Sequence, residues 1–208
     1  MNVVFDFGAV LFTWRPAEIV ADVFPERATD AARAQQLARD LFSHEDWHDF
    51  DRGLVHPHDL VERTAKRLGL ASDTLHAMVQ GIGDRLVPMQ ESVALLRSLH
   101  DKRRTGDGVH GLYFLSNMPE PYARELEQKH AFLNHFDGGI FSGDVKLSKP
   151  DARIYQALQS RYNLEPERTL FIDDLLINID AAKALGWKGI HFTSAPQLAE
   201  QLREEHGL

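Results

Sequence analysis

The sequence predicts an α/β fold, in which helices cover both faces of a parallel β-sheet and a small helical segment follows the first strand. Short apolar runs rich in β-branched and aromatic residues alternate with longer segments of helical periodicity, which is typical of a doubly wound sheet. From residue 15 to residue 85 the chain has no strand signal, and its apolar residues recur at helical spacing. These two observations predict a core with a helical insertion.

Five segments have the composition of buried strands. Each is short and apolar and ends near a polar residue or a turn: VVFDF, LYFLS, GGIFS, TLFID and KGIHF. In a Rossmann-like parallel sheet, the carboxyl ends of the strands line the binding crevice. We therefore expect the polar residues at these ends to converge, although they are far apart in the sequence. They are Asp6, Ser116, Asn117, Asp173 and Asp174.

The insertion is expected to form an all-helical cap over this crevice. Its helical spacing is clear at Leu60, Val61, Ala65 and Leu68. We place the cap at residues 15–85 and the α/β core at residues 1–14 and 86–208.

Composition and charge exclude several classes of protein. Of the 208 residues, 43% are hydrophobic, which is enough for a substantial core. The formal net charge of −8 argues against a general binder of nucleic acid or of anionic membranes. The chain has no cysteine, so disulfides, thiolate nucleophiles and cysteine-ligated zinc are excluded. It shows no signal peptide and no membrane-spanning run, so we expect a cytoplasmic protein. We further expect it to be a monomer or a homodimer.

Asp6 ends the first strand in the stretch VVFDFGAVL, and Gly8 follows two positions later. A carboxylate exposed by such a turn can serve as a nucleophile or a metal ligand, because nearby backbone amides can bind an anion. For an isolated aspartate, a strand-end cap is the alternative interpretation.

Ser116 and Lys149 carry groups that a phosphate site needs. Ser116 and the Asn117 amide follow the second strand in LSNMPEPY and can donate hydrogen bonds to a phosphoryl oxygen, although such a pair can also cap a helix. In KLSKPDARIY, Lys149 precedes Pro150, which starts a helix. A lysine held there can stabilise a carboxylate nucleophile and the phosphate that it attacks. A surface lysine before a helix is the alternative.

Asp173 and Asp174 are adjacent acids that end an apolar strand in LFIDDLLINIDAAKALGW. Like charges at this spacing repel each other unless a cation offsets them. Carboxylate oxygens are the ligands of hard divalent cations. The pair therefore predicts a metal site.

Taken in order, FDFGAVL, LSNMP, SKPDARIY and FIDDLLINIDAAKALGW resemble the four motifs of the haloacid dehalogenase (HAD) superfamily of hydrolases. The helical insertion after the first motif resembles the C1 cap of its subfamily IA. The segments HEDWHDFDRG and LSNMPEPY are similar to those of α-D-glucose-1-phosphate phosphatases and of the N-terminal phosphatase domain of epoxide hydrolases. The resemblance covers the whole chain.

The resemblance implies a Mg²⁺-dependent phosphohydrolase that acts on a small phosphorylated metabolite, such as a sugar phosphate, through an aspartyl-phosphate intermediate. Asp6 would be the nucleophile. The Mg²⁺ ion would be held by Asp6, by the backbone carbonyl of Gly8 and by Asp174.

The remaining motif residues receive roles from the same resemblance. Ser116 and the Asn117 amide would bind the phosphoryl oxygens, and Lys149 would neutralise the crowded negative charge. Asp173 would orient Lys149 or a metal-bound water, and Asn178 would hold that loop in place.

Gly8 departs from the family pattern, because most phosphatases of this superfamily carry an aspartate there that protonates the leaving oxygen. Losing such a group removes about 10²–10⁴-fold of rate for a poor leaving group. The first explanation is an acidic leaving group, as in an anomeric sugar phosphate or an acyl phosphate. The second is a substitute, either a cap histidine (His44 or His48) or a bound water. The third is a loss of turnover.

Substrate choice is expected to lie with the cap. Trp47 could stack on the face of a sugar, and Arg52 could pair with a second anionic group. Asp51 is a further candidate. A tryptophan on an amphipathic helix is otherwise a core residue.

Two competing functions stay open. A metal-independent 2-haloacid dehalogenase-type hydrolase would use Asp6 to displace halide from carbon, but the pair of Asp173 and Asp174 argues against it. A catalytically weak phosphometabolite-binding protein would keep the pocket without turnover.

Overall fold

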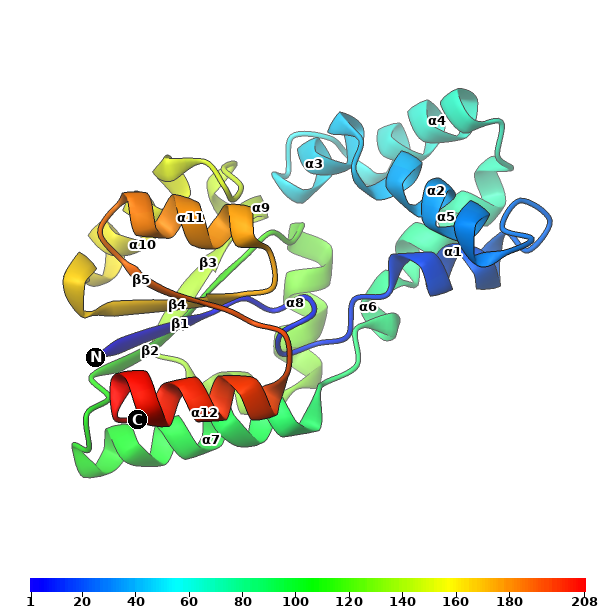
Figure 1. The fold of residues 1–208 in the computed structure, drawn as a ribbon. Helices are drawn as coiled ribbons and strands as arrows, with labels where there is room; N and C mark the ends of the chain where they lie inside the picture. The colour runs from blue at the N-terminus through cyan, green and yellow to red at the C-terminus, as the bar shows by residue number, and fades with distance from the viewer.

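The computed structural model describes residues 1–208 and contains a five-stranded parallel sheet with helices on both faces (Figure 1). The strand order is β3-β2-β1-β4-β5. The strands are β1 (Asn2–Phe5), β2 (Gly111–Ser116), β3 (Gly138–Phe141), β4 (Thr169–Asp173) and β5 (Lys188–His191). The predicted doubly wound α/β fold is confirmed, and all five predicted segments form strands.

The first strand ends earlier than the sequence predicts, because the chain turns directly after Asp6. The Asp6 backbone N–H still donates to the carbonyl of Ile172 at 2.9 Å, as a strand residue would. The next amide, that of Phe7, donates instead to the Asp6 side chain at 2.7 Å. The Phe7 carbonyl then accepts from Leu11 and Phe12. This turn leaves the Asp6 carboxylate at the carboxyl edge of the sheet.

Alternating residues of the central strand bury themselves in two separate cores. Val3 and Phe5 belong to the larger apolar cluster, whereas Val4 belongs to the smaller one on the other face. The first face is covered by α7 (Gln90–Thr105), α8 (Glu120–Lys129) and α12 (Ala195–His206), and the second by α10 (Ala152–Tyr162) and α11 (Leu176–Ala184). Three short elements complete this region: η1 (Ala131–His135), α9 (Ser142–Val145) and η2 (Pro166–Arg168).

Between β1 and α7 the chain forms helices and no named strand. They are α1 (Pro16–Val23), α2 (Ala31–Phe42), α3 (Glu45–Asp51), α4 (Pro57–Leu68), α5 (Ser72–Gln80) and α6 (Ile82–Arg85). Figure 1 shows α1 to α5 gathered beyond the carboxyl ends of the strands, on the side where the binding crevice is expected. The division into a core of residues 1–14 and 86–208 and a cap of residues 15–85 stays a proposal.

The two chain segments that lead into and out of this helical group run side by side. Thr13 N–H donates to the Val87 carbonyl at 2.8 Å, and Met89 N–H donates to the Leu11 carbonyl at 2.8 Å.

None of the helices combines the length and the apolar character that crossing a membrane requires.

Candidate active site

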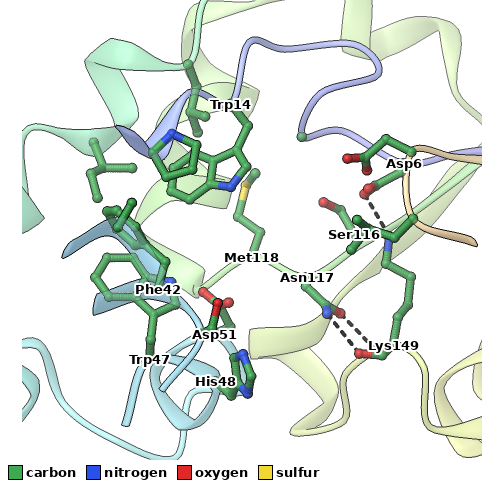
Figure 2. Close-up of a pocket in the computed structure, with 18 of the residues that line it drawn as sticks. Asp6, Trp14, Phe42, Trp47, His48, Asp51, Ser116, Asn117, Met118 and Lys149 are labelled. Atoms are coloured by element: carbon green, nitrogen blue, oxygen red, sulfur yellow. Dashed lines mark hydrogen bonds and ion pairs between the residues drawn. The ribbon is translucent and has the colours of Figure 1, made fainter. Parts of the chain in front are cut away.

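Lys149 connects two of the strand-end acids. Its ammonium nitrogen lies 2.8 Å from Asp6 Oδ1 and 2.6 Å from Asp173 Oδ2, and its side chain is 1% exposed. Figure 2 shows Lys149 and Asp6 on the same side of a pocket, with the end of the Lys149 side chain directed toward the Asp6 carboxylate. Burial alone would lower the pKa of Lys149, but the carboxylates of Asp173 and Asp6 outweigh it and raise the pKa. The lysine is therefore a permanent cation between two acids.

The surroundings of Asp6 disfavour the ionised form of its carboxyl group. Burial raises its pKa to about 7; Lys149 works against this rise, and the neighbouring acids Asp173 and Asp174 add to it. One of its oxygens is already bonded to Phe7 N–H and Lys149. The second oxygen has no protein partner, so it is free to contact a ligand.

Asp173 is fully buried, and its hydrogen bonds hold it toward Lys149. Oδ1 accepts from Leu175 N–H at 2.8 Å and from Asn178 Nδ2 at 3.0 Å, and Asn178 also approaches Oδ2 at 3.1 Å. Both oxygens are therefore used within the protein. This geometry agrees with the expectation that Asp173 orients Lys149 and that Asn178 holds the loop.

The acids at the strand ends fit a divalent cation. Asp6, Asp173 and Asp174 each offer a carboxylate oxygen, and these oxygens lie within 4.8 Å of one another. Burial and the neighbouring Asp173 raise the pKa of Asp174. Lys149 is the only cation bonded within this group of three acids, so negative charge is left uncompensated. Oxygen donors with excess negative charge suit a hard ion such as Mg²⁺.

Because both oxygens of Asp173 are used, Asp6 and Asp174 are the acids left to hold such an ion. Gly8 lies in the lining of the same pocket as these two side chains. This placement agrees with the ligand set that the motif resemblance implies.

Ser116 and Asn117 follow β2 and present donors to the pocket. The Ser116 hydroxyl is buried among the lining residues and has no hydrogen-bond partner in the protein. The Asn117 carboxamide is already used: its Nδ2 donates to the Lys149 carbonyl at 3.0 Å and its Oδ1 accepts from Lys149 N–H at 2.8 Å (Figure 2). The side chain thus joins two motif loops, and the backbone N–H of Asn117 is the amide left for a ligand.

The pocket has a volume of about 500 Å³ and lies between the strand ends and the inserted helices. Trp47 lines it, but the side chain is 4% exposed and packs edge-on against Phe42 and Phe50. Arg52 does not line it, contrary to the expectation that it meets a second anionic group of the substrate. The Arg52 guanidinium turns back to pair with Asp49 on its own helix, and this ion pair removes it from the pocket.

The two cap histidines have different positions. His44 Nδ1 accepts from Asp46 N–H at 3.1 Å, which caps α3, and His44 lies outside the pocket lining. His48 lines the pocket and is largely exposed to solvent. The part of its ring that is buried still loses hydration, which lowers the pKa of His48. Of the two histidines proposed as substitutes for the missing acid, only His48 therefore lines the cavity.

Gly8 is not required by its backbone conformation. Its φ lies outside the left-handed region, and a Cβ atom would meet Trp14 Cβ at 3.8 Å, an ordinary van der Waals contact. A side chain could therefore be built at this position. Gly8 lines the pocket together with Asp6 and Trp14.

Sequence reasoning missed several residues that line the pocket. Phe42 and Leu86 form part of its wall although they belong to no motif, and Met118 does so from within the LSNMP motif, where it received no role. For Trp14, the only signal was its position directly after the first motif.

The chain is similar to hydrolases and phosphatases over most of its length. The family model described as haloacid dehalogenase-like hydrolase matches residues 2–186. The sesquiterpene phosphatase of Aspergillus oryzae is 29% identical over 97% of this chain and 94% of its own length. A phosphoglycolate phosphatase of Salmonella typhi is 27% identical over 53% of this chain and 52% of its own length.

Solved structures show the same fold. A HAD family enzyme from Bacteroides thetaiotaomicron, in complex with magnesium and inorganic phosphate, has a TM-score of 0.69 at 20% identity and covers 92% of this chain and 93% of its own. The L-2-haloacid dehalogenase of Xanthobacter autotrophicus has a TM-score of 0.66 at 20% identity, with 98% and 82% covered. Together with the family match, these similarities place the chain in the haloacid dehalogenase-like hydrolase family, and it is a hydrolase of that family.

Proposed function

We propose that this protein is a Mg²⁺-dependent phosphohydrolase that transfers the phosphoryl group of a small phosphorylated metabolite to Asp6 and then to water. The observation that carries the proposal is the position of Lys149 between Asp6 and Asp173, beside the free donor of Ser116. A carboxylate approaches a phosphate dianion only if positive charge offsets their repulsion. Lys149 supplies one such charge.

The residues of this chain have separate tasks in the proposed reaction. The free oxygen of Asp6 attacks phosphorus while the bond from phosphorus to the leaving oxygen breaks. The Ser116 hydroxyl and the Asn117 backbone N–H bind the non-bridging oxygens, and Lys149 stabilises their charge. A Mg²⁺ ion held by Asp6, Asp174 and the Gly8 carbonyl would neutralise further phosphate charge when bound.

The second step restores the enzyme. Water attacks the phosphorus of the aspartyl-phosphate, the bond between phosphorus and the Asp6 oxygen breaks, and inorganic phosphate leaves. Lys149 stays between Asp6 and Asp173 throughout and holds the carboxylate in position for the next substrate.

The relatives support phosphate transfer but differ in what carries the phosphate. Their names specify a sesquiterpene, phosphoglycolate and, for a shorter match to a protein of Thermotoga maritima, phosphorylated carbohydrates. A sugar phosphate, considered from the motifs, is therefore one candidate among several leaving groups.

Release of inorganic phosphate from para-nitrophenyl phosphate tests the proposal, with Mg²⁺ and with EDTA. We expect activity that requires Mg²⁺ and falls by at least about 10³-fold in Asp6→Asn, which removes the nucleophile. Asp107→Asn, the same change at an exposed side chain, is the matched control and should keep full activity. Metal-independent turnover, or an active Asp6→Asn variant, would refute the proposal.

Gly8 is the specific feature that favours the alternative of a metal-independent 2-haloacid dehalogenase, because such a reaction needs no acid at this position. Halide release from 2-chloropropionate in the presence of EDTA would identify that activity. Trapping of beryllofluoride by Asp6 without turnover of any phosphate ester would instead identify a binding protein.

A further inference from the structure

The pocket has two chemically different halves. The end beside Asp6 is formed by the strand-end residues and carries the polar groups that would hold a phosphate. The opposite wall comes mainly from the inserted helices and from the segment after β2. Figure 2 shows these two walls facing each other across the cavity. A phosphate bound at Asp6 would direct its organic group toward the second wall.

Apart from Asp51, the second wall is apolar where it is buried or half-buried. Its large side chains are Trp14, Phe42, Trp47, Ile82, Leu86 and Met118. Tyr122 also lines the cavity, but its hydroxyl already donates to the Val79 carbonyl at 2.6 Å, so that it offers a ligand only its ring. The Phe42 ring contacts the rings of Trp14 and Trp47 edge to face.

Polar lining residues of the inserted helices lie at the solvent-facing rim. Gln35, Arg39, Ser43 and His48 are all exposed. They can contact the outer end of a ligand but do not supply partners in the interior of the pocket.

Asp51 is the single polar residue of the inserted helices that lines the pocket without being exposed. Its carboxyl group makes no hydrogen bond and no ion pair within the protein. Burial raises the pKa of Asp51 well above its usual range, which favours the un-ionised form of the side chain. Asp51 is thus the single unexposed polar group that the inserted helices contribute to this wall.

The approach to the pocket is also apolar. Leu175 lines the cavity, and Leu175, Leu176 and Ile177 are 52%, 56% and 61% exposed. Three of the five large hydrophobic side chains that the molecule exposes are thus consecutive, and the first of them, Leu175, lines the pocket. Inside, Gly8 lines the cavity together with Asp6 and Trp14 and adds no side chain to it.

We propose that this wall binds a hydrocarbon group, so that the substrate is the phosphate monoester of a hydrophobic alcohol or phenol and not of a sugar; this inference rests on the proposed function. A sugar would bring several hydroxyl groups into a wall with almost no partners for them, and each unpaired hydroxyl disfavours binding. A hydrocarbon group loses unfavourable contact with water at the same surface.

A series of para-alkylphenyl phosphates, from methyl through butyl to hexyl, tests the inference on the wild-type protein. The leaving phenol has almost the same acidity throughout, so the missing acid at Gly8 affects all members alike. We expect kcat/KM to rise by roughly fourfold for each methylene that the pocket buries. A phenyl phosphate that carries a para-glucosyl group should be hydrolysed less efficiently than the butyl compound.

Phe42→Gln places a polar group in the wall, and Leu54→Gln is its matched control at an exposed position outside the lining. We expect Phe42→Gln to lower kcat/KM for the hexyl compound by about tenfold and to change that for the methyl compound much less. The control should follow the wild type. Circular dichroism of both variants checks that they fold.

The outcomes separate the two proposals. If the phenyl phosphates are hydrolysed but kcat/KM does not rise with chain length, or the glucosyl compound is preferred, the inference of a hydrocarbon site is wrong and the proposed function stands. If para-nitrophenyl phosphate and the whole series are inert in the presence of Mg²⁺, the proposed function fails and the inference falls with it.

Discussion

At the scale of single residues, the site depends on buried charged side chains that contact one another. Lys149 is buried with Asp6 and Asp173, and Asp173 is held in turn by Asn178 and by Leu175 N–H. Removing one member of such a buried group leaves a charge without compensation. Gly8 is the exception in this polar region, because it contributes space and a carbonyl group but no side chain.

Gly8→Asp tests what the glycine removes from the reaction. The position is free of backbone strain and its nearest side-chain neighbour is Trp14, so an aspartate can be accommodated. We expect hydrolysis of simple alkyl phosphates to accelerate by about 10²–10⁴-fold, because the new acid can protonate a poor leaving oxygen. Hydrolysis of para-nitrophenyl phosphate should hardly change.

Gly8→Asn is the matched control, since it fills the same space but transfers no proton. Equal acceleration in both variants would mean that the side chain acts through packing and not through acid catalysis. Steady-state kinetics on the two substrate classes give the comparison.

At the scale of elements, α3 is attached to the core beside the loop that follows β2. Ser142, the first residue of α9, donates from its hydroxyl to the Asp51 carbonyl at 2.5 Å, and the same oxygen accepts from Met118 N–H at 2.8 Å. Gly53 has a φ of +66°, and a Cβ there would lie 3.0 Å from the Gly143 carbonyl. A glycine at this position thus allows the loop after α3 to approach α9 closely.

Ser142→Ala is expected to destabilise the fold by about 1–3 kcal/mol, because it leaves the Met118 amide and the Asp51 carbonyl without their shared partner. Urea denaturation measures this change. Ser98→Ala, on an exposed position of α7, is the control and should alter stability by less than about 0.5 kcal/mol. Equal effects of the two substitutions would contradict the role assigned to the Ser142 hydroxyl.

At the scale of the whole molecule, the parallel sheet gathers acids from distant parts of the sequence, and the inserted helices enclose them. β1 lies between β2 and β4, so Asp6 is flanked by the ends of both strands. The enclosure also buries acids that would be ionised in the unfolded chain. The free energy of unfolding should therefore depend on pH.

Asp51→Asn isolates one contribution to this dependence. With a pKa raised in the folded state, Asp51 keeps its proton on folding at pH values where the unfolded carboxyl, near 3.8, has lost it. Stability of the wild type therefore falls as pH rises through this window, by about 1.4 kcal/mol per pH unit from this group. Asn cannot ionise, so the variant should gain stability relative to the wild type as pH rises from 4 toward the folded pKa.

Urea denaturation at a series of pH values measures this difference, with Asp107→Asn as the exposed control. A stability difference between Asp51→Asn and wild type that stays constant with pH would show that Asp51 is not held un-ionised. A difference that grows with decreasing pH would have the wrong sign.

The sequence by itself determined the sheet, its strand ends and the family. Strand composition and the chemistry of turns depend on neighbours in the chain, and for this reason all five predicted strand segments form strands. The motifs at the strand ends are local in the same sense, and the family match covers residues 2–186. The acids that end β1 and β4 were identifiable for the same reason, because parallel strands bring their carboxyl ends to one edge.

The tertiary structure decided how side chains at those positions are used. The Asn117 carboxamide forms hydrogen bonds with the Lys149 backbone, and the Arg52 side chain pairs with Asp49 instead of entering the pocket. The apolar wall joins Trp14, Phe42 and Met118, which lie far apart in the sequence and belong to different elements. The direction of each of these side chains depends on the packing of the inserted helices against the core, and no local sequence pattern encodes that packing.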